Sequence, residues 1–183
     1  MIGSITVGVW ARSFLFAFLN SFNEGYVRNA IRYDYSHLQI HHPQYRIDPL
    51  PDHYIPDAKK IDSLLNVIPV VQAFSARTVA NGMAATGRSS QGVQIIGIDT
   101  RQEATVTSLE ELIVEGTYFT GKRNPVLISK KIAKKLDAHI RSKVVLTFQD
   151  SSGNITTAAF RVDGIFESKS PKINEGVIYV KKS

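Results

Sequence analysis

The N-terminal segment constrains the fold most strongly, because residues 2–22 (IGSITVGVWARSFLFAFLNSF) are apolar or small with few exceptions. About 20 such residues span the hydrocarbon core of a bilayer. Arg12 is the one charge in the run, and a central arginine costs about 2.5 to 3.5 kcal/mol on insertion scales although its side chain can snorkel. A signal peptide is disfavoured, since no basic start and no A-x-A-like cleavage site flank the run. We predict a membrane-spanning helix or its truncated remnant; a buried globular helix is the alternative.

The same helix changes character toward its end. Apolar residues recur at helical spacing from residue 15 to residue 30, while the positions between them carry asparagine, glutamate and arginine. A helix that leaves lipid and continues into water as a stalk needs this gradient. We therefore predict that residues 13–33 form one continuous helix.

Residues 36–42 alternate, with Leu38 and Ile40 on one face and His37 and His41 on the other. This period predicts a strand with one buried face. His37 and His41 are two ligands that a zinc or copper site could use, and a third would have to be His53 or His139. The alternative, which we favour, is an exposed polar face where a helix passes into a strand.

Further along, Asp57 is placed to cap a helix with Ile61, Leu64 and Leu65 inward. Two strands are predicted at residues 70–80 and 91–99. Asn81-Gly82 and Gly87 supply turn chemistry between them, so residues 81–91 are predicted to be an exposed loop, a candidate mobile contact.

The second half of the chain carries helix and strand signals in turn. Residues 108–116 (SLEELIVEG) have capping-box spacing and predict a short helix that ends at Gly116. Ser129 is placed to cap a helix whose inner face is Ile132, Ala133 and Leu136. Alternating strands are predicted from residue 144 to 148 and from 158 to 162, with a turn at 150–154 between them, and a last strand at 176–180.

Composition and motifs argue against several classes of function. With 22 Lys and Arg against 16 Asp and Glu the net charge is +6, but the basic residues are scattered, so nucleic-acid binding is not predicted. The chain has no cysteine, which removes disulfides and thiolate metal sites. It carries neither G-x-x-x-x-G-K-[ST] nor G-x-S-x-G, and no set of nucleophile, base and orienting acid can be assembled. We predict no enzymatic activity, no catalytic residue, no metal and no cofactor.

Six segments follow one another along the chain: FLNSFNEGYVRNAIRYDYSHLQIHHPQY, VQIIGID, LIVEGTYF, PVLISKKIAKKL, KVVLTFQDSSGNITTAAFRVDGIFES and VIYV. In this order they resemble the extracytoplasmic core domain of ABC-transporter permeases of the MacB and lipoprotein-releasing type, in the FtsX-like superfamily. The resemblance covers nearly the whole chain from about residue 5. It departs from the family at residues 137–142, where a glycine turn is missing, and at the short connection 149–154, where the lipoprotein-releasing branch can carry an extended hook that captures a lipoprotein carrier.

The resemblance implies an α+β fold, in which a mixed α/β porter-like subdomain contains an inserted strand-rich sabre-like subdomain. Residues 1–35 would be the end of the first transmembrane helix and the stalk. Residues 36–100 and 158–183 would form the porter-like subdomain, and residues 101–157 the sabre-like insertion.

The resemblance also implies a function. The permease would lie in the bacterial inner membrane with this domain on the periplasmic side and lipid around the N-terminal helix. It would dimerise with a second permease copy and pair with a cytoplasmic ABC ATPase. It would couple ATP hydrolysis to the export or release of an envelope protein, lipoprotein or small molecule by mechanotransmission. The rival hypotheses are a self-contained soluble binding module, in which Phe14, Phe16 and Phe18 are buried and His37 and His41 bind a metal, and an enzyme with an unrecognised pocket.

Overall fold

A computed structural model describes residues 2–29, 38–45, 47, 52–120, 124–150 and 152–182, with the side chains of the first helix described at residues 7–22. The elements are listed in chain order: α1 (Ile2–Asn29), α2 (Ala58–Val67), β1 (Thr78–Ala85), β2 (Ser90–Ile98), α3 (Thr100–Val106), a 3-10 turn η2 (Leu109–Leu112), β3 (Ile113–Gly116), β4 (Pro125–Ser129), α4 (Lys130–Leu136), β5 (Lys143–Gln149), β6 (Ile155–Phe166), α5 (Pro171–Gly176) and β7 (Val177–Lys181). Helices and strands are mixed along the chain, as the predicted α+β class requires.

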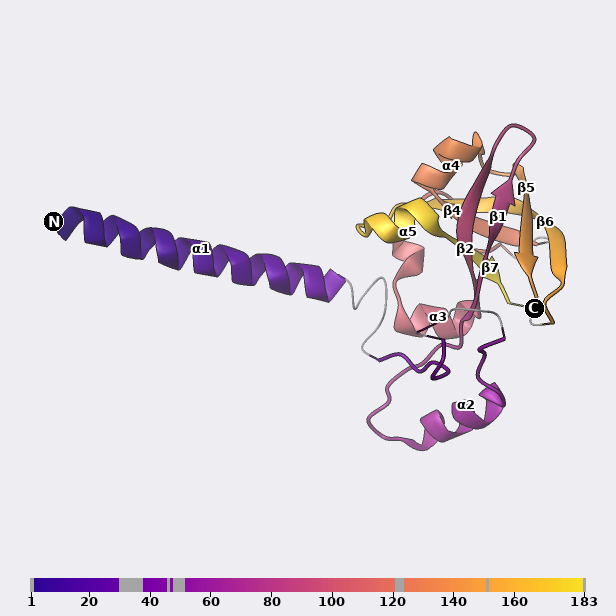
Figure 1. The fold of residues 1–183 in the computed structure, drawn as a ribbon, viewed down its shortest axis with the longest axis horizontal. Helices are drawn as coiled ribbons and strands as arrows, with labels where there is room; N and C mark the ends of the chain where they lie inside the picture. Colours follow the sequence, from indigo (N-terminus) through magenta and orange to yellow (C-terminus); the bar gives the residue numbers. More distant parts are fainter. Residues whose placement is uncertain are drawn as a thin grey trace.

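The strands form one seven-stranded sheet that closes on itself. Its order is β3-β6-β4-β7-β2-β1-β5, and β5 also pairs with β6, so every strand except β3 belongs to a closed barrel (Figure 1). The long strand β6 makes the closure possible, because residues 155–161 pair with β5 and residues 161–166 pair with β4. The strands come from all three segments between residue 36 and the C-terminus. The division into porter-like and sabre-like subdomains stays a prediction.

The core consists of two buried clusters: one joins the strands to α4, and the other joins Leu127 and Phe166 to Ile173 of α5. Strand β4 is buried at all five positions, as expected for a continuous apolar run that is covered on both faces. Ser129 ends β4 and caps α4, since its Oγ accepts a hydrogen bond from the backbone N–H of Ile132 at 3.1 Å. Ile132, Ala133 and Leu136 are buried against the sheet. The predicted cap and inner face of this helix are both confirmed.

The C-terminal strands also agree with the sequence pattern. Val144, Leu146 and Val162 are fully buried, Phe148 and Phe160 pack against the same cluster, and Asp150 closes the turn by accepting from the backbone N–H groups of residues 152 and 154. Strand β7 occupies the predicted position. The short helix α5 was not predicted.

The predicted strand at residues 36–42 is wrong where the structure describes it. Residues 38–42 have no strand conformation, and the side chains of Leu38 and Ile40 are 87% and 55% exposed. Alternation alone suggested a buried face, but residues 38–42 pair with no strand of the described sheet. Residues 36 and 37 lie outside the described part of the chain.

Helix α2 is present, but its predicted cap and inner face are wrong. Asp57 adopts a left-handed backbone conformation, with φ of 56°, and its side chain makes no cap hydrogen bond. No residue of α2 is buried, and Leu64 is 58% exposed. The apolar stripe of this helix therefore lacks the partner surface on which the prediction depended.

Two short local signals were misread in the middle of the chain. The predicted loop at residues 81–91 is wrong, because Asn81 and Gly82 lie inside β1 and pair with Gln94 and Val93 of β2. The turn is confined to residues 86–89, where the N–H of Thr86 bonds to the carbonyl of Ser89 at 2.9 Å. The predicted helix at residues 108–116 is one 3-10 turn followed by β3, because residues 113–116 pair with the end of β6.

Gly82 serves close packing of strands and not a turn. A Cβ at this position would lie 2.5 Å from the carbonyl oxygen of Thr147 on β5, a backbone atom that cannot move alone. We expect Gly82→Ala to lower the free energy of unfolding by about 1 to 3 kcal/mol, as overpacking does. The matched control is Gly92→Ala on β2, where a Cβ meets nothing within 4 Å. Urea unfolding of both variants checks this, and equal stability of the two would contradict it.

Candidate functional site

The chain enters and leaves the barrel at one end. At the start of β1, Thr78 pairs with Gly97 of β2, and Gly97 pairs in turn with Val180 near the end of β7. The N–H of Lys182 then donates to the carbonyl of Ile98 at 2.8 Å. We call this end of the barrel, comprising residues 75–78, α3 and residue 182, the tether end. The residues that precede β1 and those that follow β7 therefore lie at the same end of the barrel.

A buried carboxylate organises the tether end. The side chain of Glu103, on α3, is 1% exposed. Its Oε1 accepts from Arg77 Nη2 at 2.5 Å and from Thr107 Oγ1 at 2.7 Å, and its Oε2 accepts from Arg77 Nε at 3.1 Å and from Ser75 Oγ at 2.8 Å. The paired guanidinium and the two hydroxyls make burial of the charge tolerable. The cluster fastens residues 75–77, which lead into β1, to α3.

Two further contacts hold α3 in position. Asp99 caps the helix, because its Oδ1 accepts from the N–H groups of Arg101 at 2.9 Å and Gln102 at 3.3 Å. These backbone hydrogen bonds lower the pKa of the Asp99 carboxyl. The Oε1 of Gln102 accepts from the N–H of Ala76 at 3.5 Å. Helix α3 is thus tied both to the end of β2 and to the chain that enters β1.

The pKa of Tyr118 is sensitive to the negative charges at the tether end. Burial of its hydroxyl, together with the negative charges of Glu103 and Glu110, raises the pKa of Tyr118 to about 12. The hydroxyl is enclosed and has no hydrogen-bond partner among the described residues. The pKa of Tyr118 is therefore set first by burial and then by the charge of the Glu103 carboxylate.

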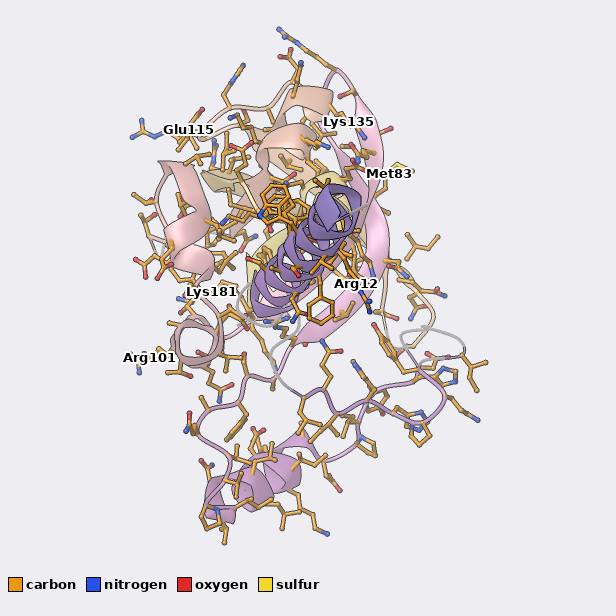
Figure 2. The ribbon with its side chains drawn as sticks, turned by 90° about the vertical axis from the view of Figure 1, so that its left-hand side faces the viewer. Arg12, Met83, Arg101, Glu115, Lys135 and Lys181 are labelled. Atoms are coloured by element: carbon orange, nitrogen blue, oxygen red, sulfur yellow. The ribbon has the colours of Figure 1, made fainter. Side chains whose placement is uncertain are left out.

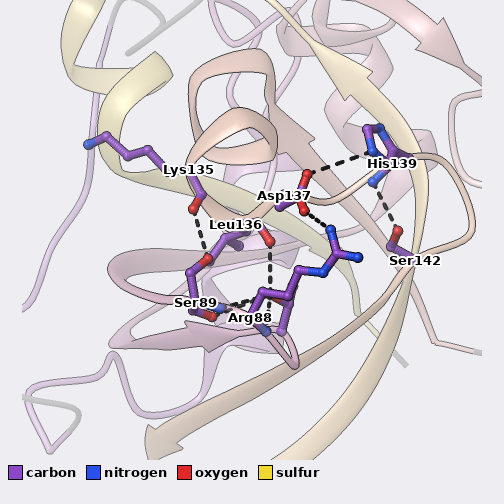
Figure 3. Close-up of polar contacts among 8 residues, drawn as sticks. Arg88, Ser89, Lys135, Leu136, Asp137, His139 and Ser142 are labelled. Carbon is purple, nitrogen blue, oxygen red and sulfur yellow. Dashed lines mark hydrogen bonds and ion pairs between the residues drawn. The ribbon is translucent and has the colours of Figure 1, made fainter.

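A second polar cluster lies at the tip of the β1–β2 hairpin (Figure 3). Thr86 Oγ1 and Ser89 Oγ donate to the carbonyls of Leu136 and Lys135, each at 2.8 Å. These carbonyls belong to the last turn of α4, where no helical N–H can reach them. Arg88 forms an ion pair with Asp137, and both side chains are exposed. The cluster has the geometry of a C-terminal helix cap and locks the hairpin tip to α4.

The histidines that the structure describes do not come together as a metal site. His41 bonds to Gln39 at 2.8 Å and stacks on Tyr45, while His42 stacks on His53 with 5.5 Å between ring centroids. His139 lies near Asp137 and is 84% exposed. Within the described ranges, no three His, Asp or Glu side chains lie close enough to hold a metal ion. His37 lies outside them.

The described side chains of α1, at residues 7–22, carry no part of the core. Phe14, Phe16 and Phe18 are 61%, 69% and 57% exposed, so the prediction that they would be buried in a self-contained module is wrong. Trp10, Phe14, Phe18 and Phe22 stack in succession at 5.8, 6.4 and 6.5 Å, and we call these four the aromatic ladder. In Figure 2 α1 points toward the viewer, with Arg12 labelled.

The predicted continuous helix from residue 13 is present as far as Asn29, and residues 30–33 lie outside the described part. Among the described helices, none combines the length and the apolar character needed to cross a membrane.

Sequence reasoning missed the residues of the tether end. No motif in the sequence includes Glu103, and Arg77 lies far from it in sequence, at a separation of 26 residues. The one local signal was Thr107 at helical spacing from Glu103, which brings both side chains to one face. Such a pair is too common to single out a buried cluster.

Comparisons with known proteins find similarity among solved structures. No protein-family model matches the chain, and no curated protein matches it. The chain is similar to the extracellular domain of the noncanonic ABC-type transporter YknZ from Gram-positive bacteria, at 19% sequence identity and a TM-score of 0.49. The match covers 68% of this chain and 61% of that one, so this chain spans less than two thirds of the solved domain.

Proposed function

We propose that this chain is the extracytoplasmic domain of an ABC-transporter permease, and that it couples ATP hydrolysis in the cytoplasm to the export or release of an envelope substrate. The observation that carries the proposal is the tether end. A domain inserted between membrane helices must receive and return its chain on the side that faces the membrane. Here the strands β1 and β7 meet that requirement, because both are joined to β2 at the same end of the barrel.

The Glu103 cluster supports mechanical coupling. A movement of the chain before β1 can act on the barrel only if the joint between them is stiff. Four hydrogen bonds to one buried carboxylate supply that stiffness, since buried and satisfied polar networks rigidify the structure around them. In this proposal, the conformational change driven by ATP passes along α1 and residues 30–77 to this joint. This coupling is called mechanotransmission.

The proposed partners follow from the order of family-like segments in the sequence. They are a cytoplasmic ABC ATPase, a second permease copy, membrane lipid at the N-terminal helix, and an envelope protein, lipoprotein or small molecule as cargo. The location is the bacterial inner membrane with this domain on the periplasmic side. The chain itself performs no catalysis in this proposal, because ATP binds and is hydrolysed on the partner.

Co-purification tests the proposal. The full-length protein that contains this chain is solubilised from its native membranes with a mild detergent, isolated by a C-terminal affinity tag and identified with its companions by mass spectrometry. We expect an ABC ATPase in stoichiometric amount. An unrelated tagged membrane protein from the same cells is the control. A well-folded preparation that brings no ATPase would overturn the proposal.

A further inference from the structure

The first half of β6 has one edge that pairs with no described strand. Residues 155–161 pair with β5 on one side, whereas pairing with β4 on the other side begins only at Arg161. The sheet order gives residues 155–160 no neighbour beyond β5. Residues 161–166 of β6 therefore close the barrel by pairing with β4. Residues 155–160 have no described strand on that side.

Two hydrogen bonds show which backbone groups face the open side. Asn124 Nδ2 donates to the carbonyl of Ala159 at 3.1 Å, and the N–H of Arg161 donates to the carbonyl of Asn124 at 2.9 Å. Backbone groups of successive strand residues point to alternate sides. Residues 155 and 157, and the N–H of Ala159, consequently point to the same side. They have no backbone partner among the described residues.

Among the residues that the structure describes, this edge lacks the features that usually prevent strand pairing. Natural edge strands carry proline, inward-pointing charge or a bulge, or are covered by another element. Residues 155–160 read ITTAAF, without a proline or a charge, and Ile155 is 80% exposed. Threonine, isoleucine and phenylalanine are strand-favouring residues. The edge is therefore a ready template for a further extended segment.

We call the unpaired edge of residues 155–160 the open edge. Two cationic side chains, Lys143 and Arg161, lie next to each other where this edge ends. Lys143 of β5 lies directly opposite Arg161 of β6, although like charges in this position destabilise a sheet. The guanidinium of Arg161 donates to the carbonyl of Arg141 at 3.2 Å, and neither cation has an ion pair in the described structure. Asp163, the acidic residue next along this face, is bonded by Thr120 through its N–H at 2.9 Å and its hydroxyl at 2.8 Å. A cavity of about 420 Å³ lies here, lined by Asn124, Lys143, Ala158, Ala159, Phe160 and Arg161.

We propose that the open edge of β6 binds an extended peptide segment of a partner protein by strand addition, with an acidic end of the segment at Lys143 and Arg161. The backbone of residues 155, 157 and 159 supplies the hydrogen bonds, and Phe160 and Ala158 supply apolar contact in the cavity. Charge complementarity selects the occupant, because a carboxylate relieves the repulsion between the two cations. This inference goes beyond the proposed transport function and does not depend on an ATPase.

Peptide binding to the 183-residue chain, kept in detergent, tests the strand addition. The probes are three fluorescent eight-residue peptides of alternating valine and threonine that end in two glutamates, two glutamines or two lysines. We expect the glutamate peptide to bind at least about tenfold more tightly than the lysine peptide, since rim charges of opposite sign attract and like charges repel. The amides of Thr157 and Ala159 are expected to gain protection from hydrogen exchange.

Three variants separate strand addition from other kinds of contact. Thr157→Pro removes an N–H that β5 does not use and is tolerated on an edge, so the barrel stays folded while peptide binding falls by about tenfold or more. Thr157→Val keeps the N–H and is expected to bind as the unmodified chain does. Arg161→Gln is expected to reduce the preference for the glutamate peptide.

Other outcomes would overturn the proposal. They are no protection of Thr157 and Ala159 with any peptide, equal binding by Thr157→Pro, or equal affinity for the glutamate and lysine peptides. Concentration-dependent protection of the same amides without peptide would assign the edge to a second copy of this chain. Binding to phosphatidylglycerol micelles that Thr157→Pro does not change would assign the cations to lipid headgroups.

Discussion

Glu103→Ala is expected to cause the largest loss of stability of any single substitution at the tether end. It leaves the guanidinium of Arg77, which is 21% exposed, without its carboxylate, and it leaves the hydroxyls of Ser75 and Thr107 without their acceptor. Removing one partner of a buried ion pair costs about 3 to 5 kcal/mol. Urea unfolding followed by circular dichroism measures the change.

The matched control for Glu103→Ala is Glu110→Ala. Glu110 is exposed, lies seven residues further along the chain, and loses the same carboxylate when it is replaced. A substitution of that kind changes stability by about 0.5 kcal/mol or less. If the two variants unfold at the same urea concentration, the Glu103 cluster does not stabilise the domain.

Tyr118 gives a local measurement of the same cluster. Its pKa of about 12 is raised first by burial and then by the charge of Glu103. Glu103→Gln removes that charge while it keeps the side-chain volume, so the pKa of Tyr118 should fall toward its ordinary value and remain above it because burial persists. Ultraviolet absorbance of tyrosinate follows the titration. An unchanged pKa would mean that the carboxylate is not where the structure places it.

If the proposed function holds, the Glu103 variants also have a transport consequence. A loosened joint between residues 75–77 and α3 should leave ATP hydrolysis by the partner intact while it reduces substrate export. Glu103→Gln is the suitable variant for this experiment, because it retains an oxygen that can accept from Arg77. Loss of both activities together would indicate a misfolded domain and not a loosened joint.

The parts of the fold that could be predicted from the sequence are those with local and mutually consistent signals. Ser129 before an apolar helical stripe gave α4 with its cap, and the alternation of Val144, Leu146 and Val162 gave the buried faces of β5 and β6. In each case the local propensity and the tertiary packing agree. Consistency of that kind is what allows a pattern to specify structure.

The errors in the middle of the chain share one physical cause, which is that long-range contacts overrode short-range signals. Asn81-Gly82 is a turn dipeptide by propensity, but strand β5 approaches it so closely that only glycine fits. Residues 113–116 pair with β6, although the preceding glutamates favour a helix. The Glu103 cluster joins residues from separate elements, and a pattern within one stretch of sequence does not reveal a contact between distant residues.

Placing aspartate in the aromatic ladder is expected to abolish association of α1 with lipid, which is part of the proposed function. The four rings of the ladder are exposed along one side of the helix, and Phe14 and Phe18 lie at its centre. Aspartate at the centre of a membrane helix costs about 2.5 to 3.5 kcal/mol on insertion scales. Because 1.4 kcal/mol corresponds to a factor of ten, the double variant Phe14→Asp with Phe18→Asp should bind vesicles at least about 100-fold more weakly.

The measurement is flotation of the 183-residue chain with vesicles of phosphatidylethanolamine and a minor fraction of phosphatidylglycerol. The control carries two aspartates on the opposite side of the same helix, as Ser13→Asp with Asn20→Asp. Retained binding by the control would mean that the ladder side alone lies on the membrane, whereas loss of binding by both double variants would mean that lipid surrounds α1. Since the described side chains of α1 are exposed, neither double variant should alter unfolding of the barrel. If the ladder variant floats as well as the unmodified chain, α1 is not the lipid-binding element.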